Sequence, residues 1–354
     1  MPSPADAELT AFRRADPTAP IRVLVTHPLL VRAAELFAGL GPEFEVEFRA
    51  MDRAAVADLV DDRLEVLFAG RAPADLRRTP RLRWLQVGSA GVDHLLADPP
   101  WSRGLIVTNG RGVFGPAIAQ YVLAAVLRVN EHVDERRGLQ EDHTWPDPGD
   151  EAAVTGRLAR GQTAVVVGYG GVGREVARLL QAVGMRIIAV KARPELLEDQ
   201  GYRVPGTGDP GGTIPERIAG LDALAEVVPA AAFVVLTVPL TDTSRGLFGA
   251  GLIAALGPQA WLINIGRGPV VDEPALAGAL HDGRIGGAVL DVFGTEPLPS
   301  DSPFWRLPNT VVTPHVSGGD AGSVAIIADL FIENLRRYAR GGPLLNVVDG
   351  ARQY

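Results

Sequence analysis

Short apolar runs rich in β-branched residues alternate along this chain with longer amphipathic segments. This pattern is typical of βαβ units, in which helices connect the strands of a parallel sheet. A first series of such runs occupies residues 21–26, 45–48, 64–70, 82–87 and 105–109. A second series occupies residues 163–168, 186–190, 232–238, 260–265, 287–292 and 310–314. Because each parallel pair requires a right-handed crossover, we expect an α/β protein with two doubly wound domains.

Other segments give the predicted domains their connections and ends. Residues 115–138 are apolar at helical spacing and long enough to bridge two domains. A second segment of this kind, 321–340, ends at the helix-breaking residues 341–343. The polar stretch 141–156 contains Pro and Gly and predicts a loop. Residues 1–20 lack the apolar core of a signal peptide and predict a loose N-terminal arm.

The composition narrows the class of protein. With 354 residues, of which 47% are hydrophobic and 21% charged, the chain reads as a soluble globular protein with room for two domains. The net charge of −8 argues against nucleic acid as a partner, and the apolar runs are too short to span a membrane. The absence of cysteine excludes disulfides, thiolate catalysis and zinc-thiolate sites, and fits a cytoplasmic enzyme.

A glycine fingerprint directly follows the predicted strand 163–168. Gly168, Gly170 and Gly173 give the spacing G-x-G-x-x-G and open an apolar-periodic helical segment. Such glycines allow a tight turn, a close approach of the backbone to a pyrophosphate, and close packing of helix and strand. Together with Gly171 and Val172, they form the predicted dinucleotide-binding turn.

The end of the next predicted strand should determine the choice of cofactor. An acidic residue there would bind the ribose 2′-hydroxyl of NAD, but Val190 is followed by Lys191 and Arg193, and no carboxylate occurs before Glu195. These two cations favour the 2′-phosphate of NADP. The alternative interpretation of these cations is a solvated surface turn, so the prediction is NADP or NAD, with NADP favoured.

Several further motifs, in a fixed order, resemble those of the D-isomer-specific 2-hydroxyacid dehydrogenase family. They are VGSAGVDHL (87–95), LTVPLTDTSRGLF (236–248), INIGRGPVVDEPAL (263–276), LDVFGTEPLP (290–299), TPHVSG (313–318) and PLLNVVD (343–349). The resemblance implies a Rossmann NAD(P)-binding domain, 123–315, inserted into a flavodoxin-like substrate-binding domain, 1–122 with 316–354. It also implies a homodimer.

The same resemblance gives three residues a catalytic role. His315 would protonate the substrate carbonyl as hydride arrives from the nicotinamide, since an imidazole exchanges a proton near neutral pH. Glu296 would hydrogen-bond the other ring nitrogen and favour the protonated imidazole. Arg267 would clamp the substrate carboxylate with its planar donor fork. Gly266 and Gly268 flank this arginine, and we expect their lack of a side chain to allow a close approach of the ligand to the backbone.

Further residues receive binding roles by resemblance. Backbone amides of Ser89, Ala90 and Gly91 would meet the substrate carboxylate. Asp291 would contact the nicotinamide side of the cofactor, with capping of a turn as the alternative. The remaining predicted cofactor contacts are Thr237, Val238, Pro239, Thr243, Ile265, Gly266, Ser317 and Gly318. The other histidines show no metal-like spacing, so no metal site is predicted.

Some features of the sequence depart from the family's usual pattern. Gln120 stands where the family usually has Glu, and Tyr121 follows it; we expect this change of a helix position to leave the chemistry unaffected. The stretch 141–156 is longer than usual, and its Trp145 either reaches a neighbouring subunit's site or packs locally.

The predicted activity is NAD(P)H-dependent reduction of a small 2-oxo acid to the D-2-hydroxy acid, with glyoxylate and hydroxypyruvate as first candidates. A phosphoglycerate dehydrogenase without a regulatory domain is a less favoured alternative, because the sequence ends soon after the last predicted helix and leaves no room for the regulatory domain that many such enzymes carry. The other is an NAD(H)-sensing binding protein of the corepressor type, which has the same fold and the same triad. Turnover of a 2-oxo acid separates an enzyme from such a binding protein.

Overall fold

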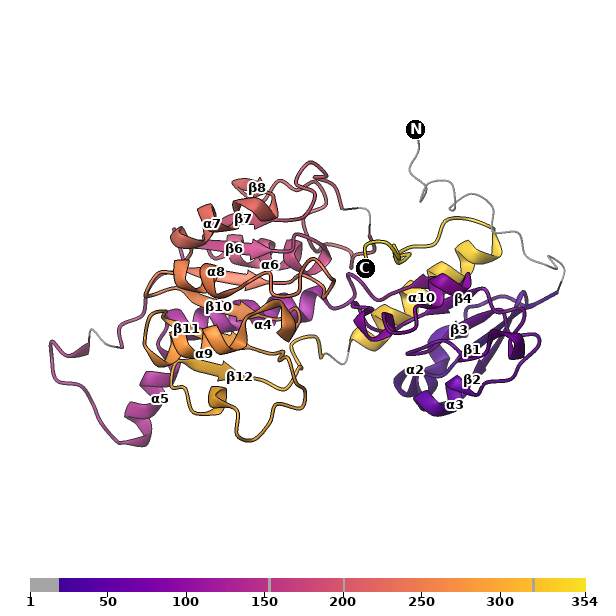
Figure 1. Ribbon diagram of the computed structural model, residues 1–354, viewed down its shortest axis with the longest axis horizontal. Coiled ribbons are helices and arrows are strands. Elements are labelled where there is room, and N and C mark those ends of the chain that lie inside the picture. The colour runs from indigo at the N-terminus through magenta and orange to yellow at the C-terminus, as the bar shows by residue number, and fades with distance from the viewer. Residues whose placement is uncertain (1–18, 152–153, 200, 320–321) are drawn as a thin grey trace. The chain divides into compact units, whose positions relative to one another are not determined.

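The computed structural model describes residues 19–151, 154–199, 201–319 and 322–354, so most of the predicted N-terminal arm lies outside the described residues. The chain forms two compact units, each with its own parallel sheet (Figure 1). The first unit comprises Met1–Phe114, Gly201–Val204 and Asp320–Tyr354. The second comprises Gly115–Gln200 and Pro205–Gly319.

These limits differ from the divisions at 122/123 and 315/316 in the sequence analysis. The helix α4 (Gly115–Asn130) is continuous and packs as a whole within the second unit, so the division comes before it. Residues 201–204 return to the first unit from within the second, which the sequence pattern did not indicate. The assignment of substrate binding to one unit and nucleotide binding to the other stays a prediction.

The sheet of the first unit has the strand order β2-β1-β3-β4-β5. This is the flavodoxin-like order 2-1-3-4-5 of a doubly wound sheet. Its strands are β1 (Ile21–Val25), β2 (Phe44–Phe48), β3 (Val66–Phe68), β4 (Trp84–Gln86) and β5 (Ile106–Thr108). Its helices are α2 (Pro28–Arg32), α3 (Arg53–Ala57) and α10 (Ser323–Ala339). The long helix α10 buries Phe331 and Tyr338 against Trp84, and thereby joins the C-terminal segment to the N-terminal sheet.

The sheet of the second unit has the order β12-β11-β10-β9-β6-β7-β8. From β8 to β11 this is the Rossmann order 3-2-1-4-5-6, and β12 extends it. Its strands are β6 (Thr163–Val167), β7 (Arg186–Val190), β8 (Arg217–Ala219), β9 (Phe233–Leu236), β10 (Trp261–Asn264), β11 (Gly287–Leu290) and β12 (Thr310–Val312). Two doubly wound parallel sheets were predicted, and the structure confirms this fold class.

One strand was missing from the prediction. The short strand β8 begins with an arginine and follows a long polar stretch, so it lacks an apolar run. Among the described strands it pairs with β7 alone, at the edge of the sheet, where one side of the strand needs no burial. Edge strands of this kind give little periodic signal.

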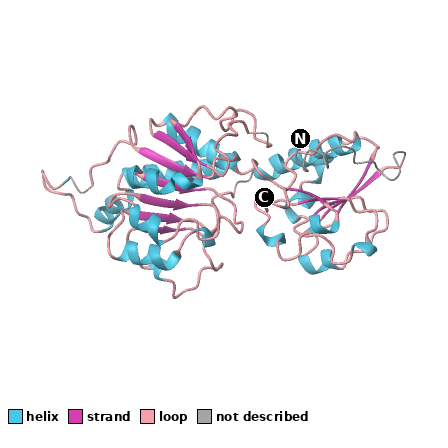
Figure 2. Ribbon diagram, turned by 45° about the horizontal axis from the view of Figure 1, so that its top comes forward, coloured by secondary structure: helices cyan, strands magenta, loops and turns pink. Residues whose placement is uncertain are grey.

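Helices cover both faces of each sheet (Figure 2). Besides α4, the second unit has α5 (Val133–Glu141), α6 (Gly171–Ala182), α7 (Leu224–Val227), α8 (Ala250–Ala255) and α9 (Glu273–His281). The helical segment expected at 115–138 is two helices, because the backbone at His132 takes the left-handed conformation, with a φ of 48°. A single helix across this position was therefore a wrong prediction.

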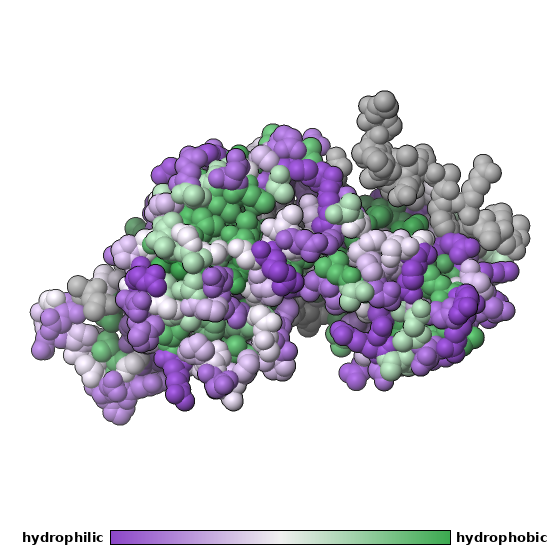
Figure 3. Space-filling view, in the orientation of Figure 1, coloured by the Kyte–Doolittle hydropathy of each residue, from purple (hydrophilic) through white to green (hydrophobic). Residues whose placement is uncertain are grey.

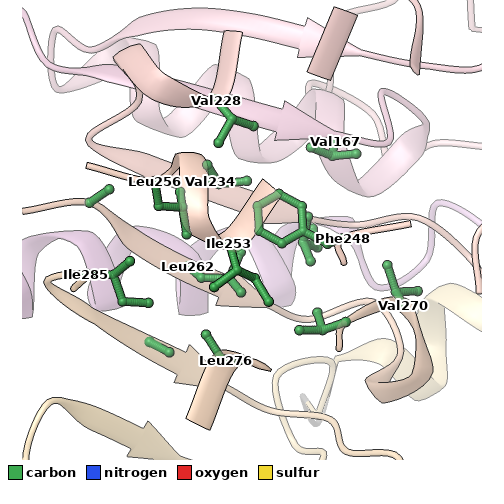
Figure 4. Packing of buried hydrophobic residues seen from close by; sticks show 14 of the residues in the cluster. Val167, Val228, Val234, Phe248, Ile253, Leu256, Leu262, Val270, Leu276 and Ile285 are labelled. Atoms are coloured by element: carbon green, nitrogen blue, oxygen red, sulfur yellow. The ribbon is translucent and has the colours of Figure 1, made fainter. Parts of the chain in front are cut away.

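The core of the second unit lies between its sheet and these helices. Figure 4 shows Val234 and Leu262 of the central strands facing Phe248, Ile253 and other apolar side chains. The continuous apolar runs of the sequence are explained by this burial on both faces of the parallel sheet. A rigid sheet core fixes the loops at its carboxyl edge, where ligands of open α/β sheets bind.

The helix α5 and residues 142–151, here called the projecting segment, project from the second unit (Figure 1). No residue of α5 is buried, and Trp145 in the following stretch is 94% exposed. Figure 3 shows apolar residues among the hydrophilic ones on this projecting segment. Local packing of Trp145, one of its two predicted fates, is therefore wrong. Among the described helices, none has the length and apolar character needed to cross a membrane.

Candidate active site

The glycine fingerprint forms the turn between β6 and α6. Gly168 has a φ of 103°, and a Cβ there would lie 2.7 Å from Thr237 Oγ1 and 2.8 Å from the Val238 amide nitrogen. A Cβ on Gly173 would overlap the Gly168 carbonyl oxygen. Both glycines are thus required by protein packing. Thr237 and Val238, predicted cofactor contacts, lie directly against this turn.

The second fingerprint glycine has a different environment. Gly170 is the N-cap of α6, and a Cβ at this position would meet nothing within 4 Å. The first amides of α6, at Gly171 and Val172 among others, have no carbonyl one turn earlier within the helix. Open space next to unsatisfied amides at the positive end of a helix dipole suits a phosphate group. The predicted pyrophosphate site therefore has the geometry that its ligand requires.

A buried polar cluster, absent from the predictions, attaches the residues after β7 to this turn. The Tyr169 hydroxyl donates to Asp209 Oδ2 at 2.6 Å, and the Asp209 carboxylate also accepts from the amides of Thr213 and Ile214. The guanidinium of Arg174 lies over the Tyr169 ring and donates to the Asp209 carbonyl. Burial raises the pKa of Tyr169 well above its ordinary value, so this phenol stays a donor. The sequence signal that could have indicated this cluster is Tyr169, a tyrosine between the fingerprint glycines Gly168 and Gly170.

Lys191 and Arg193 follow β7 at the same edge of the sheet as the fingerprint. The Gly168 amide donates to the carbonyl of Val190 at 2.8 Å, which places the start of the Lys191 turn next to the glycine turn. The Lys191 ammonium donates to the Leu196 carbonyl at 2.5 Å. Two cationic residues therefore follow the strand beside the glycine turn.

Glu296 and His315 form a hydrogen-bonded pair, as the sequence predicted. Their atoms Oε2 and Nδ1 lie 2.8 Å apart, and Glu296 Oε1 accepts from the Phe293 amide at 2.9 Å. An ionised carboxylate can only accept, so Nδ1 carries the proton and Nε2 faces away from the pair. Both side chains are exposed. The imidazole Nε2 therefore has no partner among the described residues, and the ring is oriented by a carboxylate that is itself fixed to the backbone.

Arg267 follows β10, and a buried asparagine shapes its turn. Asn264 Nδ2 donates to the Arg267 carbonyl at 3.1 Å, and Asn264 Oδ1 accepts from the Gly266 amide at 3.2 Å. The guanidinium donates to the Gly266 carbonyl at 2.8 Å. Asn264 was missed in the sequence, although an asparagine at a strand end is a common turn former.

The reason given for the glycines beside Arg267 needs correction. A Cβ on Gly266 would lie 2.7 Å from the Val238 carbonyl oxygen, and one on Gly268 would overlap the backbone of Phe293. The close neighbours of these glycines are thus other loops of the protein, where a ligand had been expected. They let the Arg267 turn pack between the ends of neighbouring strands.

Asp291 is fully buried and holds the turn that carries His315. Its Oδ1 accepts from the Val316 amide and its Oδ2 from the Ser317 amide, both at 2.9 Å. Thr313 Oγ1 donates to Oδ1 at 2.6 Å, and the His315 amide donates to the Asp291 carbonyl at 2.9 Å. This geometry is that of the turn-capping alternative. Contact of Asp291 with the nicotinamide stays a prediction.

In the first unit, the residues 89–91 follow β4. Ser89 Oγ donates to the Gly91 carbonyl at 2.7 Å, and Asn109 Nδ2 donates to the Ala90 carbonyl at 2.9 Å. These bonds fix the carbonyls of the loop, while no acceptor among the described residues is paired with the amides of Ser89, Ala90 and Gly91. Such free amides are suited to an anion.

The other predicted cofactor contacts also lie after strand ends of the second sheet. Thr237, Val238, Pro239 and Thr243 follow β9, Ile265 and Gly266 follow β10, and Ser317 and Gly318 follow β12. Parallel strands bring these segments to one edge. Within the described ranges, no group of three or more His, Asp or Glu residues is placed to hold a metal ion.

Comparisons with known proteins agree with this arrangement. Residues 123–317 match the family described as D-isomer specific 2-hydroxyacid dehydrogenase, NAD binding domain. A (S)-sulfolactate dehydrogenase from Chromohalobacter salexigens is 33% identical over 314 residues, which cover 81% of this chain and 95% of that protein.

Two solved structures are similar over nearly the whole chain. A D-isomer specific 2-hydroxyacid dehydrogenase from Xanthobacter autotrophicus, in complex with NADPH and MES, has a TM-score of 0.77 at 29% identity and covers 95% of this chain and 100% of its own. An NADPH-dependent glyoxylate/hydroxypyruvate reductase from Sinorhizobium meliloti, in complex with NADP and sulfate, has a TM-score of 0.75 at 28% identity, with the same coverage.

Proposed function

This chain belongs to the D-isomer specific 2-hydroxyacid dehydrogenase family, an NAD(P)-dependent group of oxidoreductases, and we propose that it reduces a small 2-oxo acid of the glyoxylate or hydroxypyruvate type to the D-2-hydroxy acid. The observation that carries the proposal is the hydrogen bond of 2.8 Å between Glu296 and His315, at the same sheet edge as Arg267. These residues supply a proton donor, its orienting carboxylate and a cation for the substrate.

The fingerprint turn fits a dinucleotide. Its open space lies at Gly170 and the first turn of α6, the side where a pyrophosphate would meet free amides. The reduced nicotinamide, when bound, supplies the hydride. His315 supplies the proton from Nε2, while Glu296 keeps the opposite nitrogen protonated and the ring in place. Arg267 binds the carboxylate of the 2-oxo acid.

Replacement of His315 tests the proton donor. His315→Ala is expected to lower kcat by a factor of about 10²–10⁴, the usual contribution of a general acid, with the affinity for NADPH nearly intact. Arg267→Lys keeps the charge but loses the bidentate fork, so KM for the 2-oxo acid should rise while cofactor binding stays the same. An unchanged kcat in His315→Ala would remove this residue from the chemistry.

We propose NADPH as the preferred reductant. Lys191 and Arg193 leave the sheet beside the fingerprint turn, and the two similar structures named above hold NADPH or NADP. Lys191→Asp should lower the ratio of kcat/KM for NADPH to that for NADH by about tenfold or more, because a charge-assisted contact to a phosphate is replaced by repulsion. Lys191→Ala separates loss of attraction from added repulsion. A constant ratio in both variants would exclude Lys191.

We also propose a homodimer that covers the projecting segment. Trp145 is 94% exposed, and Val133 of α5 is also exposed. Large apolar side chains on the projecting segment fit burial against a second copy. Light scattering should find a dimer for the wild-type protein and a weaker one for Trp145→Ser. A monomer at all concentrations for the wild type would contradict this proposal.

The corepressor-type alternative predicts cofactor binding without turnover. Assays with NADPH and NADH against glyoxylate, hydroxypyruvate, phosphohydroxypyruvate and sulfopyruvate distinguish the possibilities. Reduction of glyoxylate or hydroxypyruvate with the highest kcat/KM supports our proposal. Binding of the cofactor with no reduction of any 2-oxo acid would favour the sensing protein.

A further inference from the structure

The turn that carries His315 has a backbone conformation that needs external support. His315 has a φ of 54°, in the left-handed region that residues with a Cβ rarely adopt. Such a conformation is strained and persists only where the surroundings determine it. The support here is Asp291, whose carboxylate and carbonyl accept the amides of three successive residues, 315–317.

The Asp291 carboxylate is supported in turn by a chain of hydroxyl groups. Thr313 Oγ1 donates its only proton to Asp291 Oδ1, at 2.6 Å. Tyr121 OH lies 2.7 Å from the same Thr313 oxygen. Since the threonine proton is already used, the tyrosine must be the donor in this second bond. The direction of the chain is therefore Tyr121 to Thr313 to Asp291.

Tyr121 is well placed to anchor such a chain. It lies on α4, whose residues Ala119, Val122 and Val126 pack with Val176 of α6 in one buried cluster. Burial of the phenol and the negative charge of Asp291 raise the pKa of Tyr121, while its hydrogen bond with Thr313 acts in the opposite direction. The hydroxyl therefore stays protonated, and remains a donor, at neutral pH.

We infer that Tyr121 is a positioning residue for His315, acting through the Thr313 hydroxyl and the Asp291 carboxylate. The sequence alone had led us to expect that this helix position leaves the chemistry unaffected. The inference rests on the proposed role of His315 as proton donor. It adds that the placement of the imidazole depends on Tyr121 of α4, which precedes Thr313 by 192 residues in the sequence.

The test removes one hydroxyl at a time. Tyr121→Phe should lower kcat about three- to tenfold, with KM for the 2-oxo acid changed less than twofold, because one neutral hydrogen bond is lost and the substrate contacts remain. Thr313→Val should lower kcat by about tenfold or more, since Asp291 then loses a donor directly. Thr313→Ser keeps the hydroxyl and should restore most of the activity.

A double variant and a matched control sharpen the result. Tyr121→Phe combined with Thr313→Val should be no slower than Thr313→Val alone, because Tyr121 acts only through that hydroxyl. Tyr338→Phe removes a phenol hydrogen bond of 3.0 Å to Glu65 in the first unit, and should leave kcat unchanged. Additive losses in the double variant, or an equal loss of kcat in Tyr338→Phe, would overturn the inference.

One readout is independent of turnover and of cofactor. The imidazole resonance of His315, assigned by its disappearance in His315→Ala, should shift in Tyr121→Phe and stay in place in Tyr338→Phe. If His315→Ala keeps full activity, the proposed function fails, and the resonance still tests the positioning. If His315→Ala is inactive but the resonance and kcat of Tyr121→Phe match the wild type, only the positioning inference fails.

Discussion

Two turns at the carboxyl edge of the second sheet need a left-handed residue, and they meet this need in opposite ways. The fingerprint turn has Gly168, with a φ of 103°, and the turn after β12 has His315, with a φ of 54°. Glycine adopts this conformation without steric cost, so the first turn is specified by its own residues. Histidine does not, so the second turn depends on the hydrogen bonds that Asp291 accepts from the amides of Val316 and Ser317. A left-handed turn residue other than glycine thus requires support from distant parts of the chain.

Asp291→Ala should break the supported turn and give the largest effect. It leaves the amides of Val316 and Ser317 and the Thr313 hydroxyl without their buried acceptor. We expect the free energy of unfolding to fall by about 3 kcal/mol. Urea titration measures this loss, and Asp291→Asn, which keeps one carbonyl oxygen, should lose less. Equal stability of Asp291→Ala and the wild type would show that the turn does not need the Asp291 carboxylate.

Gly168→Ala tests the self-specified turn and should cost about 2 kcal/mol of stability, because it adds both strain and overlap. Its Cβ would approach Thr237 and Val238, as described above. Gly246→Ala is the matched control: its φ is 67°, but a Cβ there meets nothing within 4 Å. It should cost only about 1 kcal/mol. Equal losses in urea titrations of the two variants would show that strain alone matters.

A smaller effect concerns the pH dependence of the fingerprint turn. Although burial acts to raise the pKa of Asp209, hydrogen bonds from Tyr169 and from two amides outweigh it and hold the pKa below the ordinary value of 3.8. A lowered folded-state pKa contributes stability above the unfolded-state value, and this contribution is lost as pH falls through the folded-state value. The stability difference between the wild type and Asp209→Asn should therefore shrink at acidic pH. A constant difference between pH 7 and pH 3 in urea titrations would contradict this.

His315→Gly should give the smallest change in the free energy of unfolding. It tests how much the left-handed conformation of His315 costs. Glycine relieves the left-handed conformation but loses the exposed hydrogen bond to Glu296, and the two terms nearly cancel, within about 1 kcal/mol. Activity should be lost although the fold is kept. A stability loss near that of Asp291→Ala would mean that the imidazole, rather than Asp291, holds the turn.

Much of the fold could be predicted from local patterns. The buried strands of both sheets are continuous apolar runs, and the fingerprint lies at the junction of β6 and α6 that its glycines require. The split between α4 and α5 at His132 and the edge strand β8 were not predictable in this way. At His132 and at Arg217 of β8, neighbouring elements determine the backbone conformation. The periodicity of apolar residues therefore does not indicate it.

The sequence by itself determined the two parallel sheets, the fingerprint turn and the set of chemical groups at Arg267, Glu296 and His315. These features depend on side-chain type and short spacing, so they can be read along the chain. Only the tertiary structure decided that Gly266 and Gly268 pack against other loops, and that Tyr121, Thr313 and Asp291 join in one chain of hydrogen bonds. A hydrogen bond requires two groups to be close in space, and only the packing of α4 and of the strand ends in the folded protein brings these residues together.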